Sequence, residues 1–188
     1  YETAIIVNPI SFTHEIDLVA GWNLVSFNIH PSNTNIEAVL ASIDGKYTLV
    51  YAWDATGGHA SSGNWLKYDP AAQFGNTLNT LDDRQGFWIH MTAADTLEVS
   101  GSFEASTAIN LDDNVGGWNL VGYPHDTPLA PADALKSIEG KHDKVRAWDP
   151  AAGAWQRYLP GGDWQNTLTA VSYAHLRAHA PVLDLVCR

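Results

Sequence analysis

The sequence predicts a mostly β (α+β) protein made of two tandem small antiparallel β-sheet or barrel modules, each with one short helix and the second of them truncated. Three observations support this prediction. Segments of the first half return in the second half, apolar and polar residues alternate along both copies, and turn residues interrupt the alternation at short intervals. The chain has 188 residues, of which 45% are hydrophobic, so each module can bury a core of its own.

Five short segments show the repeat, because they return in the same order. The spacing between copies shortens after the third segment, since the loop at 55–64 (ATGGHASSGN) is longer than its counterpart at 150–154 (PAAGA). The matching segments are Gly21–Phe27 with Gly117–Tyr123, Ser42–Lys46 with Ser137–Lys141, Ala52–Asp54 with Ala147–Asp149, Trp65–Tyr68 with Trp155–Tyr158, and Asn76–Leu78 with Asn166–Leu168.

The repeat divides the chain into four segments: a leader or linker (1–11), a first module (12–105), an incomplete second module (106–170) and a tail (171–188). The matching ends near Ala170. Where the first copy continues with Gly86–Trp88 (GFW), the second reads Leu176–Ala178 (LRA). The sequence therefore predicts that the second module lacks its last strands.

The tail differs from the rest in composition, with no Trp or Gly but with the only cysteine of the chain, Cys187. Its sequence, VSYAHLRAHAPVLDLVCR, resembles translated sequencing-adapter read-through at the end of a metagenomic fragment. The alternative is a natural divergent end, since terminal repeats often diverge. On both interpretations we expect no functional role for Cys187, His175 or His179.

Within a module, residues 14–29 (HEIDLVAGWNLVSFNI) predict two strands joined by a turn at Ala20-Gly21. A helix is expected over 34–45 (TNIEAVLASIDG), with Thr34 and Glu37 in capping-box spacing and Gly45 at its end. Its apolar face would comprise Ile36, Val39, Leu40 and Ile43, and the second copy would place Pro131 at the first helical position with Leu135 and Ile138 on that face.

The second half of each module predicts a hairpin, formed in the first copy by residues 47–54 (YTLVYAWD) and 64–69 (NWLKYD). In the second copy the hairpin is tighter, with Asp149-Pro150 and Gly153 as turn residues. Two further strands, 85–92 (QGFWIHMT) and 95–101 (DTLEVSG), are expected to complete the first module only.

The segments Gly21–Phe27, Trp65–Tyr68, Gly86–Ile89 and Leu97–Gly101 resemble the tandem GWNLVS/GFWI-type repeat modules of secreted and cell-surface proteins of bacteria and archaea. The resemblance covers residues 16–170. It implies an extracellular or cell-surface location beside other domains of a larger protein, and no particular activity. A kelch propeller does not fit, because kelch repeats run about 50 residues and contain no helix.

Charge and composition argue against several partners. The net charge of −11 disfavours nucleic acid, and no apolar run approaches the length of a membrane-spanning helix, so membrane insertion is not expected. The sequence carries no recognisable catalytic, cofactor or metal motif, and its eight histidines are scattered singly. Asp54 and Asp149, and the pairs Asp82-Asp83 and Asp112-Asp113, are interpreted as turn residues that bond their own backbone. We therefore expect no enzyme, no cofactor and no metal.

The eight tryptophans are the unusual feature of the composition. Trp22 and Trp88 are predicted to be core residues of alternating strands. The aromatic residues that flank the hairpins could instead stack on sugar rings, with Asn64, Asp69 and Gln73 as polar neighbours. These candidate ligand-binding residues are Trp53, Trp65, Tyr68, Trp148, Trp155 and Tyr158.

Two functions follow as expectations. The first is a non-catalytic extracellular module, structural or adhesive, within a larger surface protein. The second is a carbohydrate-binding module attached to a secreted hydrolase, with a polysaccharide or cell-envelope polymer as its partner. Exposed and coplanar hairpin aromatics would favour the second function.

Overall fold

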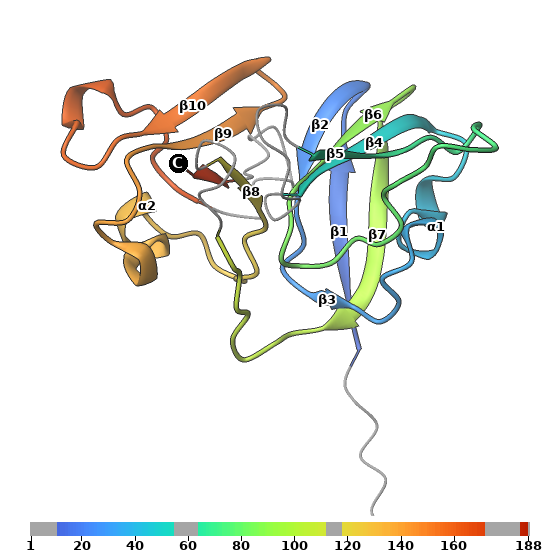
Figure 1. The fold of residues 1–188 in the computed structure, drawn as a ribbon, viewed down its shortest axis with the longest axis horizontal. Coiled ribbons are helices and arrows are strands. Elements are labelled where there is room, and N and C mark those ends of the chain that lie inside the picture. Colours follow the sequence, from blue (N-terminus) through green and yellow to red (C-terminus); the bar gives the residue numbers. More distant parts are fainter. Residues whose placement is uncertain (1–10, 55–63, 112–117, 172–184, 188) are drawn as a thin grey trace, which may run out of the picture.

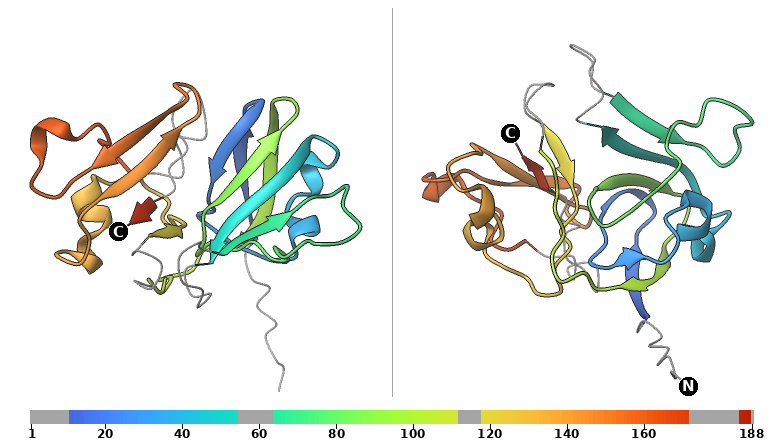
Figure 2. Two further views of the ribbon diagram at one scale, coloured as in Figure 1. Left: turned by 45° about the horizontal axis from the view of Figure 1, so that its top comes forward. Right: turned by 60° about the horizontal axis from the view of Figure 1, so that its bottom comes forward.

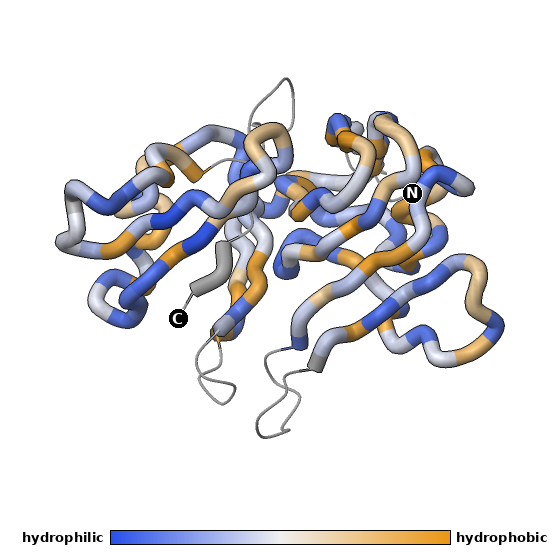
Figure 3. Tube along the Cα trace, turned by 90° about the horizontal axis from the view of Figure 1, so that it is seen from above, coloured by the Kyte–Doolittle hydropathy of each residue, from blue (hydrophilic) through white to orange (hydrophobic). Residues whose placement is uncertain are grey.

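The computed structural model describes residues 11–54, 64–111, 118–171 and 185–187, and in these the chain is mostly β, as predicted. The described strands form three antiparallel sheets, and none of them closes into a barrel. The two modules lie side by side, with the helices on their outer flanks (Figure 1). Hydrophobic and hydrophilic residues are interspersed along the chain in both modules (Figure 3).

The first module is a two-layer sandwich. One sheet has the strand order β2-β6-β4-β5 and the other β1-β7-β3. The chain therefore changes sheets at the predicted turn between β1 and β2, instead of forming a hairpin there. The strands are β1 (Phe12–Leu18), β2 (Gly21–Val25), β3 (His30–Pro31), β4 (Tyr47–Asp54), β5 (Asn64–Tyr68), β6 (Phe87–Met91) and β7 (Asp95–Ser102).

The core of the first module lies between these two layers. Period-2 alternation places every second side chain of a strand on the inner face, and those side chains are almost fully buried. The predicted β4–β5 hairpin is present. The inner residues include Ile16 and Leu18 of β1, Leu97 and Val99 of β7, Phe87 and Ile89 of β6, and Val50 and Ala52 of β4.

The predicted helix covers one end of this core, as a short α-helix, α1 (Ile36–Val39), continued by a 3-10 turn, η1 (Ala41–Ile43). All four residues of the predicted apolar face are buried, and Gly45 has a positive φ of 73°. The predicted cap was wrong by one position. Asn35, and not Thr34, accepts the backbone N–H groups of Glu37 and Ala38, because a short polar side chain directly before the first turn reaches them best.

The second module contains one sheet with the order β10-β9-β11-β8, which repeats the order β5-β4-β6-β2 of the first module. Its strands are β8 (Asn119–Val121), β9 (Val145–Asp149), β10 (Ala154–Tyr158) and β11 (Leu185–Cys187), and its helical turns are α2 (Pro131–Ala134), η2 (Lys136–Ile138) and η3 (Asp163–Gln165). The tail strand β11 lies between β9 and β8, where the first module has β6. That the tail is non-native stays a prediction.

The described part of the second module has no counterpart of the β1-β7-β3 layer. Ile109 and Leu111, which precede the second GWN segment as β1 precedes the first, lie in an irregular stretch. A smaller core remains on the inner face of the sheet. It comprises Val121, Tyr123, Leu135, Val145, Ala147, Leu168 and Val171.

The two modules meet where β8 passes the loop that precedes β6 (Figure 2). The backbone N–H of Gly122 donates to the carbonyl oxygen of Arg84 at 3.1 Å, and the N–H of Tyr123 donates to Ser26 Oγ at 3.4 Å. Gln85 forms an isolated β-bridge with Val121. These contacts bring the outer faces of the two related sheets toward each other.

Candidate functional site: an aromatic groove between the modules

The outer face of the β2-β6-β4-β5 sheet is aromatic. Because Val50 and Ala52 face the core, Tyr51 and Trp53 of the same strand face outward. The strand register carries this face across the sheet. Residues directly opposite each other share a face, so it also includes Trp22 opposite His90, Leu24 and Tyr51 opposite Trp88, and Trp65 opposite Trp53.

The second module presents the related face of its own sheet. Trp148 of β9 lies opposite Trp155 of β10, with the ring centroids 5.5 Å apart. The guanidinium of Arg146 lies 5.6 Å from the ring centroid of Trp118, within the range of a cation–π contact. The repeat therefore builds the same kind of aromatic surface twice.

These two aromatic faces meet. Trp88 contacts Trp148 and Trp155 edge to face, with centroids 5.6 and 5.8 Å apart, and Trp53 Nε1 donates a hydrogen bond to the Trp118 carbonyl oxygen at 3.0 Å. Between them lies an aromatic groove of about 590 Å³, lined by Trp22, Tyr51, Trp65, Trp88, Trp148 and Trp155. A second hollow of about 290 Å³, lined by residues that include Trp53 and Trp118, shares Trp65, Trp88 and Trp155 with it.

The walls of the groove are partly open to solvent. Trp22, Trp65 and Trp155 are 40%, 49% and 43% exposed, values that are high for such large apolar side chains. Their rings are not coplanar with their neighbours. Trp53 and Trp65 meet at 71°, and Trp148 and Trp155 at 70°. The site is a channel with aromatic walls and not a flat platform.

Few polar groups reach the aromatic groove. His90 lies 4.8 Å from Trp22 between ring centroids, and its Nδ1 shares a hydrogen bond of 2.9 Å with Thr48 Oγ1. The indole nitrogen Nε1 of Trp148 is buried and has no hydrogen-bond acceptor among the described residues.

Four of the six candidate residues come together at the junction of the modules: Trp53, Trp65, Trp148 and Trp155. Tyr68 and Tyr158 do not, because they lie three residues after a groove tryptophan and therefore on the opposite face of the strand. Tyr68 is 8% exposed, and its hydroxyl donates to Glu37 Oε1 at 3.3 Å. Burial and the Glu37 carboxylate raise its pKa.

Tyr158 packs against the second core, beside His142. Of the three polar neighbours expected at the hairpin, Asp69 instead accepts the N–H of Ala71 in its own turn, at 3.0 Å. Gln73 is exposed and does not line the aromatic groove, and the side chain of Asn64 lies outside what the structure describes.

The prediction that Trp22 is a core residue was wrong, because it is 40% exposed. Trp88 is partly buried and packs against the first core, but it lies on the outer face and, like Trp22, lines the aromatic groove. The alternation of residues along β6 could have predicted the position of Trp88. If Phe87 and Ile89 occupy the core face, Trp88 between them must face outward. Tyr51 was missed for the same reason, because both faces of β4 are apolar.

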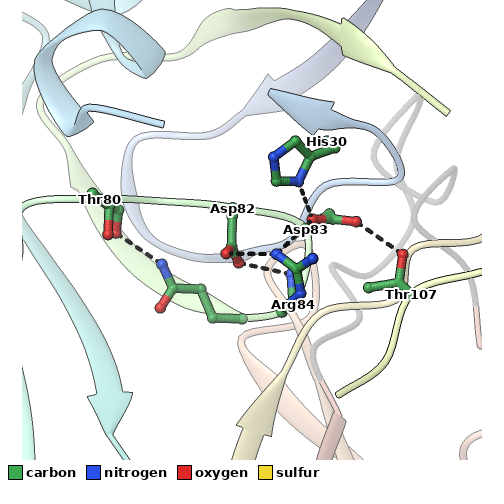
Figure 4. A network of polar contacts seen from close by, with 7 residues as sticks. His30, Thr80, Asp82, Asp83, Arg84 and Thr107 are labelled. Atoms are coloured by element: carbon green, nitrogen blue, oxygen red, sulfur yellow. Dashed lines mark hydrogen bonds and ion pairs between the residues drawn. The ribbon is translucent and has the colours of Figure 1, made fainter. Parts of the chain in front are cut away.

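A polar network at the junction of the modules holds the segment between β7 and β8, called the linker from here on (Figure 4). The Asp83 side chain is only 1% exposed. Its Oδ1 lies 2.8 Å from His30 Nδ1, and its Oδ2 accepts the Thr107 hydroxyl at 3.0 Å. Asp82 behaves as a predicted turn residue and accepts the Arg84 N–H, whereas Asp83 is turned inward and joins β3 to the linker. This network holds the linker against the first module, at the junction beside the aromatic groove.

Asp149 accepts the N–H groups of Ala151 and Ala152, as predicted for a turn residue, and Asp112-Asp113 lie outside the described residues. The described residues contain no group of three or more His, Cys, Asp or Glu side chains suited to a metal ion.

No helix in the described part of the chain has both the length and the apolar character to cross a membrane. Comparison of the sequence with protein-family profiles and with curated proteins gave no match, and neither did a search of solved structures.

Proposed function

We propose that this chain is a non-catalytic binding module that holds a carbohydrate chain in the aromatic groove between its two halves, as part of a secreted or cell-surface protein. The observation that carries the proposal is the convergence of six aromatic side chains, three of them substantially exposed, on one groove. Its volume lies within the range of small-ligand sites, roughly 300–1,000 Å³.

The chemistry of the groove suits a sugar. The C–H faces of a pyranose ring are apolar and pack on indole rings, while its hydroxyl groups need hydrogen-bond partners at the edges. The exposed Trp22, Trp65 and Trp155 supply indole rings for such packing.

The shape of the groove favours a single soluble glycan chain. A flat array of coplanar rings would suit the surface of a crystalline polysaccharide, but here most neighbouring rings are steeply inclined, as Trp53 is to Trp65 at 71° and Trp148 to Trp155 at 70°. Such walls can contact a chain from several sides. The net charge of −11 disfavours acidic polysaccharides, so we expect a neutral glycan.

A structural or adhesive role is the second candidate. Contacts of Trp88 with Trp148 and Trp155, and the hydrogen bond of Trp53 to Trp118, hold the modules together without any ligand. On this hypothesis the aromatic faces act only as an interface, and the chain spaces or joins other domains of a larger surface protein.

Tryptophan emission during titration with soluble neutral polysaccharides separates the two candidates. We expect a saturable shift in the full chain and a loss of binding of about tenfold or more in Trp65→Ala and Trp155→Ala, because each removes an aromatic wall. Trp164→Ala is the matched control, since Trp164 is 86% exposed and does not line the groove. If no glycan shifts the emission, the binding hypothesis is rejected and the structural role is favoured.

A further inference from the structure

The aromatic groove adjoins the second hollow, and the two spaces have walls in common. Trp65, Trp88 and Trp155 border both of them. Trp65 and Trp155 are 49% and 43% exposed, so solvent reaches the rings at which the two spaces adjoin. A chain-like ligand that occupies both spaces therefore passes from one to the other along these three rings.

Each space also has aromatic walls of its own. Trp22 and Tyr51 line the aromatic groove only, with their ring centroids 6.0 Å apart. Trp53 and Trp118 line the second hollow only. A sugar ring bound in one space is therefore next to a pair of aromatic side chains that a ring bound in the other space does not contact.

A polar side chain lies beside a tryptophan of each space. The imidazole of His90 lies 4.8 Å from Trp22 between ring centroids, and the guanidinium of Arg146 lies 5.6 Å from the ring centroid of Trp118. A guanidinium carries only hydrogen-bond donors, and an imidazole carries a donor and an acceptor. Both groups can bond hydroxyl groups of a sugar that packs on the neighbouring indole ring.

The two volumes indicate how many sugar units fit. The second hollow, with about 290 Å³, is close to the lower limit of small-ligand sites, which measure roughly 300–1,000 Å³, so it suits a single sugar ring. The aromatic groove, with about 590 Å³, has about twice that volume and suits two linked rings. A free monosaccharide would leave at least one of the spaces empty.

We propose that the aromatic groove and the second hollow together bind about three consecutive units of one glycan chain, two in the groove and one in the hollow. This inference rests on the carbohydrate-binding function proposed above. Each filled position removes more apolar surface from water, so the affinity should increase with chain length until all positions are filled. The site therefore selects polymers over free sugars.

Oligosaccharides of increasing length test the proposal. The probes are β-linked oligomers of glucose, mannose and xylose, from the monosaccharide to the hexasaccharide, titrated into the full chain and followed by isothermal titration calorimetry. In a series that binds, we expect the affinity to rise by about tenfold with each unit up to the trisaccharide and by less than about twofold beyond it.

Two variants assign the positions. Trp118→Ala removes a wall of the second hollow but keeps the backbone carbonyl that accepts the Trp53 hydrogen bond, so it should weaken the trisaccharide by about tenfold and leave the disaccharide unchanged. Trp22→Ala removes a wall of the aromatic groove and should weaken the disaccharide and the trisaccharide equally. Trp164→Ala is the matched control, because Trp164 lines neither space.

The inference is overturned if the affinity reaches its maximum at the monosaccharide or disaccharide, or if a polysaccharide binds but no oligosaccharide does. Equal weakening of the disaccharide and the trisaccharide in Trp118→Ala, with an unchanged circular dichroism spectrum, would also overturn it. These results leave the proposed function uncontradicted. If neither oligosaccharides nor polysaccharides bind, the proposed function is rejected, and this inference with it. The length series in the unaltered chain decides alone if the variant does not fold.

Discussion

The β2-β6-β4-β5 sheet of the first module is covered on both faces, by the β1-β7-β3 sheet on one side and by the second module on the other. The related sheet of the second module faces the first module with its outer side, and its inner side borders a cavity of about 470 Å³, with no second sheet there among the described residues. The strand order is the same in both, although β11, which takes the place of β6, comes from the tail that does not match the repeat. The second layer depends on β7, a partner distant in sequence, and without such a partner the counterpart of β1 stays irregular.

The largest expected difference between the modules is in independent folding. A polypeptide of residues 12–105 should melt in a single cooperative transition, because it contains both layers and nearly the whole of the larger core. A polypeptide of residues 106–188 should show no cooperative transition by circular dichroism, because its smaller core lacks a second layer. Cooperative melting of residues 106–188 would contradict the comparison.

A matched pair of leucines tests the difference in core packing between the two modules. Leu40 and Leu135 occupy the same position of the repeat, and Leu40 is fully buried beneath the second layer whereas Leu135 borders the cavity. Leu40→Ala should cost about 3–5 kcal/mol of unfolding free energy, and Leu135→Ala about 1–2 kcal/mol, because the surroundings of Leu135 are already incompletely packed. Urea denaturation of both variants measures the difference, and equal costs would mean that the second module is packed as tightly as the first.

The junction gives a smaller effect. Asp83→Ala should destabilise the chain by about 1–3 kcal/mol, since it leaves His30 and the Thr107 hydroxyl without their buried partner. Asp82→Ala is the matched control, because the Asp82 side chain is more exposed and its loss should cost about 0.5 kcal/mol. If the two variants unfold at the same urea concentration, Asp83 does not hold the linker.

The smallest effect concerns alkaline pH. Burial raises the pKa of Tyr123 in the second module to about 12, whereas an unfolded tyrosine titrates near pH 10. A raised folded-state pKa contributes stability that is complete below about pH 10 and is lost as pH rises toward 12. Tyr47 in the first module is shifted further in the same direction by burial and by Tyr68, so its titration should come later.

Absorbance at 295 nm, read with circular dichroism from pH 9 upward, measures this order. Tyr123→Phe should remove the part of the alkaline destabilisation that belongs to the second module. A titration in which all tyrosines ionise together near pH 10 in the folded chain would contradict the assignment.

Much of the fold could be predicted because it follows from local patterns of apolar, polar and turn residues. Three features depend only on residues that are close together in the sequence. They are the helix face from Ile36 to Ile43, the hairpin around Trp53 and Trp65, and Pro131 at a helix start. The cap at Asn35 was missed because Thr34 offers the same chemistry one residue earlier. The first residue of a helix depends on backbone geometry, which the residue types alone do not determine.

The candidate site was only half predictable, for a physical reason. Alternation tells which residues share a face, but it does not tell which face meets water when both are apolar, and so Trp22 and Trp88 were assigned to the core. The aromatic groove exists because two faces from distant parts of the chain meet. The inward turn of Asp83 has the same origin, since its partner Thr107 belongs to the linker.

The two copies of the GWNLV segment differ at the residue that follows, which is Ser26 in the first copy and Gly122 in the second, and both lie at the contact between the modules. Ser26 supplies a hydroxyl acceptor to the second module, whereas a Cβ atom on Gly122 would overlap the carbonyl oxygen of Asp83. The two modules are therefore not interchangeable. At this junction the leading module supplies the hydroxyl acceptor and the following module supplies the glycine.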